Sequence, residues 1–97
     1  MGSTLNIDNS LHIMDNVIEL DLDKILTKSL TELIKDICQY TDSVFKEWSQ
    51  YTDYGIGLLY FNNQEVKIYW EDFPNILSFE FKSKIDADIF LKKIIMA

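Results

Sequence analysis

The chain has 97 residues, in which 16 Asp and Glu oppose 9 Lys and no Arg, so the formal net charge is −7. An apolar share of 47% is ordinary for a globular protein, and the length suits one soluble domain over residues 1–97. Binding to nucleic acid or to anionic membranes needs clustered basic side chains, so this charge argues against both as direct partners.

The sequence lacks the usual signals for secretion or membrane insertion. No run reaches the roughly 20 apolar residues that span a bilayer. The first residues lack the basic and apolar regions of a signal peptide. Cys38 is the single cysteine, so an internal disulfide cannot form. We therefore expect a cytoplasmic protein.

The acidic residues are concentrated in two segments. Residues 1–23 carry a net charge of −5 and residues 42–72 carry −4, whereas residues 24–41 and 73–97 carry +1 each. Grouped charges of one sign create a local potential that attracts partners of the opposite sign. A basic partner is therefore expected.

The N-terminal part of the chain is predicted to contain a tail and a short strand or hairpin. Residues 1–10 are small and polar without periodicity, and we expect a flexible tail there. In residues 11–22, apolar positions flank Asp15-Asn16, a dipeptide that favours turns because both side chains can bond nearby backbone amides.

An amphipathic helical segment is predicted between residues 22 and 51, because apolar residues recur there at helical spacing. Asp21 or Asp23 is a suitable N-cap for its start. Asp42-Ser43 is a second suitable N-cap pair, so we expect a break or kink near Thr41, and the choice between one helix and two stays open. The apolar positions are Leu22, Leu26, Leu30, Leu33, Ile34, Ile37, Val44, Trp48 and Tyr51.

Strands dominate the prediction for the next part of the chain. Residues 56–61 and 65–70 flank Asn62-Asn63-Gln64, which predicts a β-hairpin, and Val66, Ile68 and Trp70 alternate with Lys67 and Tyr69 in its second strand. A third strand is predicted over residues 76–82, with Leu77, Phe79 and Phe81 facing inward.

The chain is predicted to end in an amphipathic helix that begins with the capping pattern Ser83-x-x-Asp86. The expected fold class is α+β, with a small antiparallel meander of about three to four strands. An N-terminal amphipathic helical segment and a C-terminal helix pack against one face of the meander. The apolar stripe of the last helix is Ala87, Phe90, Leu91, Ile94 and Ile95.

Residues that could carry catalysis or hold a metal are few. His12 and Cys38 are the only histidine and cysteine, and nothing basic near Cys38 would lower its pKa, so we expect no catalytic pair. Asp21-x-Asp23 and Glu71-Asp72 supply oxygen ligands but lack the longer series and the glycine of a calcium loop. Gly55-x-Gly57 is not followed by a helix, as a phosphate loop would require. We expect a non-enzymatic protein without metal or cofactor.

Ten of the thirteen aromatic residues fall between residues 40 and 73, which overlaps the second acidic segment. We expect Phe45, Trp48, Phe61 and Trp70 to belong to the core. Tyr51, Tyr54 and Tyr69, which we expect on the exposed face, lie near carboxylates and have the composition of an interface in which rigid aromatic anchors lie among charges that steer a basic partner. The predicted partner-binding residues are Tyr51, Asp53, Tyr54, Tyr69, Glu71 and Asp72.

The acidic α+β plan, with the segment Ile68-Tyr69-Trp70-Glu71-Asp72-Phe73, resembles the small acidic immunity proteins that accompany bacterial toxins, including those of contact-dependent growth inhibition systems. The resemblance implies a tight complex with one cognate toxin domain in the cytoplasm of the producing cell. The inhibited activity, most often a nuclease, would belong to the partner. We expect the protein itself to be a monomer or a weak dimer.

Two alternative functions stay open. A phage-type inhibitor that mimics nucleic acid would use the same negative charge. An intracellular adaptor or chaperone-like module would instead use the predicted helix of residues 22–51 as its interface. Burial of Leu26, Leu30 and Leu33 together with exposure of residues 51–54 and 69–72 would favour an inhibitor. An exposed apolar stripe on this helix would favour the adaptor.

Overall fold

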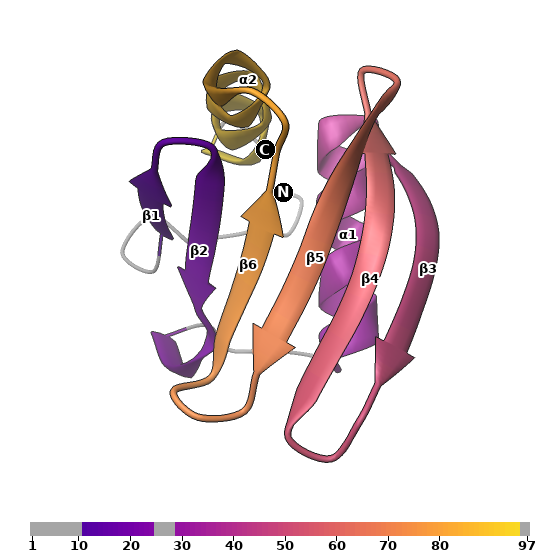
Figure 1. Ribbon diagram of the computed structural model, residues 1–97, viewed down its shortest axis with the longest axis vertical. Coiled ribbons are helices and arrows are strands. Elements are labelled where there is room, and N and C mark those ends of the chain that lie inside the picture. Colours follow the sequence, from indigo (N-terminus) through magenta and orange to yellow (C-terminus); the bar gives the residue numbers. More distant parts are fainter. Residues whose placement is uncertain (1–10, 25–28, 96–97) are drawn as a thin grey trace, which may run out of the picture.

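The computed structural model describes residues 11–24 and 29–95, which form one six-stranded antiparallel sheet and two α-helices (Figure 1). The α+β class is confirmed, but the sheet has six strands where about three to four were expected. Its order is β1-β2-β6-β5-β4-β3. The strands are β1 (Leu11–Met14), β2 (Val17–Asp21), β3 (Val44–Gln50), β4 (Tyr54–Phe61), β5 (Gln64–Glu71) and β6 (Ile76–Glu80), and the helices are α1 (Leu30–Thr41) and α2 (Lys84–Ile95).

The N-terminal hairpin joins the main sheet because β2 pairs with β6. Asp15 adopts a left-handed conformation with φ of 55° in the turn between β1 and β2, as the predicted Asp15-Asn16 turn requires. The side-chain amide of Asn16 donates a hydrogen bond to the carbonyl of Phe81, and Ile18 is fully buried. The hairpin is confirmed, while the expected tail of residues 1–10 lies outside the described residues.

The start of helix α1 differs from the prediction. Ser29 is its N-cap, and Ser29 and Glu32 form a reciprocal capping box in which each side chain accepts from the other's backbone N–H. Asp21 and Asp23 therefore do not cap α1, and Leu22–Lys24 forms a short 3-10 turn instead. The helical prediction around Leu26 lies outside the described residues.

The end of helix α1 confirms the predicted break near Thr41. Asp42 is left-handed with φ of 57°, and its N–H donates to the carbonyls of Cys38 and Gln39. The N–H of Ser43 donates to the Cys38 carbonyl at 2.8 Å. These bonds satisfy the last carbonyls of the helix and turn the chain into a strand.

The predicted continuation of the helix to Tyr51 is wrong, because residues 44–50 form the edge strand β3. A β-bulge shifts the register between Phe45 and Glu47, so Phe45 lies opposite Leu59 and Trp48 lies opposite Gly57. In a regular strand, residues three apart point to opposite faces of the sheet. The bulge puts Phe45 and Trp48 on the same face, and both pack against the core. Spacing of three is typical of a helix, which explains the error.

The remaining strands agree with their predictions. Asn62 and Asn63 have φ of 53° and 62°, and they form the two-residue turn that connects β4 to β5. In β6 and just beyond it, Leu77, Phe79 and Phe81 are all buried, as predicted. The strand itself ends at Glu80.

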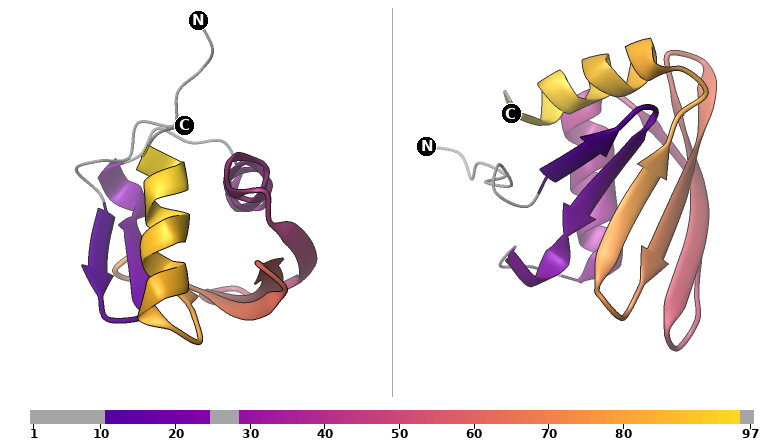
Figure 2. Two further views of the ribbon diagram at one scale, coloured as in Figure 1. Left: turned by 90° about the horizontal axis from the view of Figure 1, so that it is seen from above. Right: turned by 60° about the vertical axis from the view of Figure 1, so that its left-hand side comes forward.

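Both helices lie on one face of the sheet, and the sheet curves around them (Figure 2). The hydroxyl of Ser83 accepts from the N–H of Asp86, which confirms the predicted start of α2. Phe90 of α2 is fully buried among aromatic rings and lies closest to Phe81, with 4.8 Å between centroids. Phe61 and Trp70 are also buried, so the four aromatics predicted for the core all belong to it or pack against it.

Candidate interaction surface

The second face of the sheet carries no described helix (Figure 2). Both polar and apolar side chains lie on this uncovered face. Alternation along the paired strands brings six carboxylates to it, together with Lys67. The bulge residue Lys46 adds a second lysine, whose ammonium lies over the outward ring of Tyr60. These counts concern residues 11–24 and 29–95. The carboxylates are those of Glu19, Asp21, Glu47, Glu65, Glu71 and Glu80.

Three tyrosines form an exposed group at one end of this face. The rings of Tyr51 and Tyr54 stack with 4.7 Å between centroids and an interplanar angle of 18°. The ring of Tyr69 lies 6.4 Å from that of Tyr54. The N–H of Tyr51 donates to the carbonyl of Tyr54 at 2.8 Å, which closes the turn between β3 and β4. The tyrosines are between 38% and 49% exposed, so part of each side chain is open to solvent.

Carboxylates surround these tyrosines. Glu71 lies directly opposite Tyr54 in the β4-β5 register. The N–H of Asp72 donates to the carbonyl of Asp53 at 2.9 Å, which joins the turn after β5 to the turn before β4. The structure therefore brings together all six residues that the sequence selected, and all six are exposed. We call Tyr51, Asp53, Tyr54, Tyr69, Glu71 and Asp72 the tyrosine-carboxylate patch.

The local electrostatics of this patch are visible at Tyr69. Desolvation by its neighbours raises the pKa of the Tyr69 phenol, and the negative charge of Glu71 raises it further, with smaller contributions from Tyr54 and Asp53. The phenol consequently stays protonated as a hydrogen-bond donor over the whole physiological pH range.

Asn75 ties the turn between β5 and β6, which begins at Asp72, to two other segments, and sequence reasoning missed it. Its side-chain oxygen accepts from the Trp70 indole N–H at 3.0 Å, and its amide donates to the Asp23 carboxylate at 2.9 Å. Its carbonyl accepts from the N–H of Leu22 at 3.0 Å. Asn75 has a φ of 68°, a left-handed value that asparagine tolerates. An asparagine in a turn was therefore the signal that the sequence offered for this position. In the same turn Phe73 is 92% exposed.

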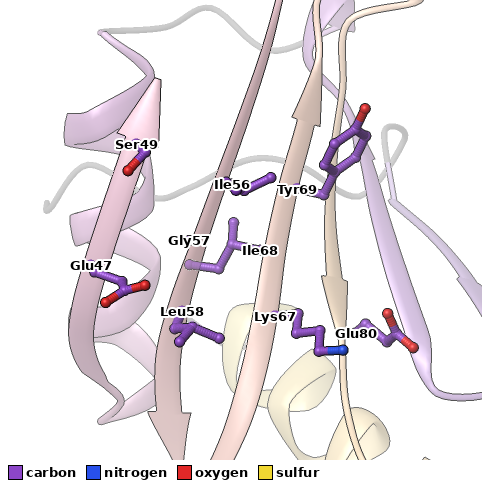
Figure 3. A pocket seen from close by; sticks show the side chains of 9 residues that line it. All are labelled: Glu47, Ser49, Ile56, Gly57, Leu58, Lys67, Ile68, Tyr69 and Glu80. Carbon is purple, nitrogen blue, oxygen red and sulfur yellow. The ribbon is translucent and has the colours of Figure 1, made fainter. Parts of the chain in front are cut away.

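A hollow of about 470 Å³ lies beside the patch, and the sequence analysis did not identify it. Figure 3 shows Ile56 and Leu58 of β4 in its middle, with Tyr69 of β5 on one side and Glu47 of β3 on the other. Tyr69 thus belongs both to the patch and to the wall of the hollow.

The other candidate residues lie apart from the tyrosine-carboxylate patch. Cys38 lies in the core at 4% exposure, and burial raises the pKa of its thiol to about 11. His12 is exposed on β1, opposite Glu19. Among the described residues, no group of three or more His, Cys, Asp or Glu side chains is arranged to hold a metal ion. None of the described helices is both long and apolar enough to cross a membrane.

Comparison of the chain with protein-family models, with curated proteins and with solved structures finds no match.

Proposed function

We propose that this protein is a non-enzymatic inhibitor that binds a basic partner protein through the tyrosine-carboxylate patch. In the form that the sequence resemblance implies, it is an immunity protein and the partner is a cognate toxin domain, most often a nuclease. The observation that carries the proposal is the convergence of three exposed tyrosines and three exposed carboxylates on one surface, drawn from two turns and from strands β4 and β5.

The physical chemistry of this surface supports protein recognition. Tyrosine supplies a large contact area and loses little conformational entropy on binding, and such residues dominate the binding energy of many interfaces. Carboxylates around the anchors accelerate encounter with a basic partner and disfavour an acidic one. A basic active-site surface of a nuclease would have the complementary charge.

The burial of helix α1 supports the inhibitor over the adaptor. Leu33 is 2% exposed and Leu30 packs against the core. Residues 44–50 are a strand, so the 22–51 helix on which the adaptor alternative depended is not formed. The apolar stripe of α1 is therefore occupied within the chain.

Affinity capture tests the proposal. The tagged protein is exposed to lysate of its native host, washed at low and at high salt, and the retained proteins are identified by mass spectrometry. The expected result is one basic protein that is toxic when expressed alone and harmless when co-expressed with this chain.

Two charge reversals provide the matched comparison. Glu71 faces Tyr54 in the patch, whereas Glu65 faces Tyr60 at the other end of the same two strands. Glu71→Lys should slow association, with a strong dependence on salt, and should weaken protection. Glu65→Lys should retain both. Equal capture and protection by the two variants, or a retained partner without toxicity, would refute the proposal.

A further inference from the structure

The hollow next to the tyrosine-carboxylate patch has an apolar middle and an acidic side. Ile56 is 46% exposed, and it lies with Leu58 between the carboxylate of Glu47 and the ring of Tyr69 (Figure 3). Since Tyr69 is shared with the patch, the hollow directly adjoins the patch.

The carboxylate of Glu47 is available to a partner. Within the part of the chain that the structure describes, Glu47 makes no ion pair and no side-chain hydrogen bond. Lys67, the lysine that lines the hollow, is the register partner of Glu80 and extends toward Glu80 on the side away from Glu47. Glu47 is therefore the charged residue that β3 contributes to the lining of the hollow, and it has no cation partner among the described residues.

The negative charge of the surrounding face favours an occupant with positive charge. Six described carboxylates lie on the uncovered face against two lysines, Lys67 and Lys46, the latter with its ammonium 5.4 Å from the centroid of the outward Tyr60 ring. An occupant that brings positive charge is attracted, and an acidic one is repelled.

We propose that the hollow receives one arginine side chain of the basic partner, an inference that rests on the proposed function and names the group recognised. The methylene stem of the arginine would lie on Ile56 and Leu58, where apolar contact is favourable. Its guanidinium would bond the Glu47 carboxylate, since a planar cation pairs with a carboxylate through two parallel hydrogen bonds. The hollow thus selects a partner that presents an arginine beside the surface bound by the patch.

A peptide titration tests this without any toxin domain. The ¹⁵N-labelled full chain is titrated with acetyl-Gly-Arg-Gly-amide, and backbone amide shifts are followed by NMR. The expected result is a saturable shift at Ile56, Gly57 and Leu58. The same peptide with citrulline, which has the shape of arginine without its charge, should give little shift. A lysine peptide should bind more weakly because it lacks the planar group.

Two isosteric variants distinguish binding in the hollow from general attraction of the peptide to the negative charge of the face. Glu47→Gln should raise the peptide concentration at half-saturation about threefold or more, because it removes the charge partner. Glu65→Gln removes one charge from the same face outside the hollow and should leave it unchanged. A Leu58→Ala variant, which keeps every charge, should also weaken binding.

Three results would overturn the inference: equal shifts with arginine and citrulline, equal effects of Glu47→Gln and Glu65→Gln, or shifts confined to the tyrosine-carboxylate patch. These results differ from failure of the proposed function. Saturable arginine binding with no toxic partner captured contradicts the inhibitor and retains the arginine site. A captured toxin with no effect of Glu47→Gln contradicts the arginine site alone.

Discussion

The indole of Trp48 packs on Gly57 across the β3-β4 pair. A Cβ added at Gly57 would stand 2.7 Å from Cε3 of Trp48 and would also meet the backbone carbonyl of Glu47. At Gly55 an added Cβ would stand 2.7 Å from Cη2 of Trp48 and would meet indole atoms alone. The two glycines therefore form the site that accepts the tryptophan ring.

Gly57→Ala should lower the free energy of unfolding by about 2 kcal/mol, because a backbone atom cannot yield to the added methyl group. Gly55→Ala should cost less, since the far end of an indole can shift. A Trp48→Leu background should remove most of the cost of Gly55→Ala and little of that of Gly57→Ala. Urea denaturation of the two double-mutant cycles measures this, and similar coupling for both glycines would contradict the assigned contacts.

Phe90→Ala should lower the free energy of unfolding by about 3 to 5 kcal/mol, because it leaves a cavity among buried rings. Its ring lies 5.2 Å from that of Phe61 and 5.5 Å from that of Phe79, centroid to centroid. Phe73→Ala is the control, because Phe73 is 92% exposed. Its unfolding free energy should stay within about 0.5 kcal/mol of wild type. Comparable losses of unfolding free energy in the two variants would contradict the packing of α2 against the core.

Cys38 should resist thiol reagents in the native protein and react once the chain unfolds in urea. Its thiol is buried, and the raised pKa of about 11 leaves little thiolate at about pH 8. Because the folded thiol holds its proton more tightly, stability should decrease as pH rises from the unfolded pKa toward about 11. A Cys38→Ala variant should lack this decrease. Native labelling as fast as that of a free thiol would place Cys38 at the surface.

The Tyr69 phenol should titrate above the ordinary tyrosine pKa, and Glu71→Gln should lower its midpoint toward that value. The charge of Glu71 disfavours the phenolate, although desolvation is the larger cause of the shift and remains in the variant. Ring NMR shifts followed through alkaline pH measure the midpoint. Glu65→Gln serves as the control and should leave the midpoint unchanged. A midpoint that Glu71→Gln also leaves unchanged would contradict the interaction between the Glu71 carboxylate and the Tyr69 phenol.

Tyr54→Ala should weaken binding to the captured partner by about 2 kcal/mol without a matching loss of unfolding free energy, as expected for an interface anchor. Tyr60→Ala is a close control, because Tyr60 lies outward on the same strand and is also 38% exposed. It should leave the affinity unchanged. Calorimetric titration together with urea denaturation separates binding from folding, and a stability loss as large as the binding loss would assign Tyr54 to the fold.

The error over residues 44–50 has a specific physical origin. Hydrophobic periodicity distinguishes a strand from a helix only while the strand alternates regularly, and the bulge at Phe45 and Glu47 interrupts that alternation. Phe45 and Trp48 then imitate one face of a helix. Residues 64–71 carry no bulge, and their regular alternation predicted β5 correctly.

The candidate site was selected from composition, and its assembly depends on strand pairing. Tyrosines near carboxylates suggested an interface, but the distance between Tyr54 and Tyr69 follows from the β4-β5 register. The hollow at Ile56 and Leu58 could not be inferred, because the face of a strand that stays uncovered depends on where the helices pack. Asn75 was missed for a related reason, since its partners Trp70 and Asp23 come from separate segments.

The sequence by itself determined the α+β class, the two tight hairpin turns, the capped C-terminal helix and the acidic character of the surface, because each depends on local propensity or on summed charge. Tertiary structure decided that residues 44–50 form an edge strand, that the N-terminal hairpin joins β6, and that six separated residues meet in one patch. These outcomes require contacts between residues distant in the chain, and local patterns carry no information about which partners those contacts will join.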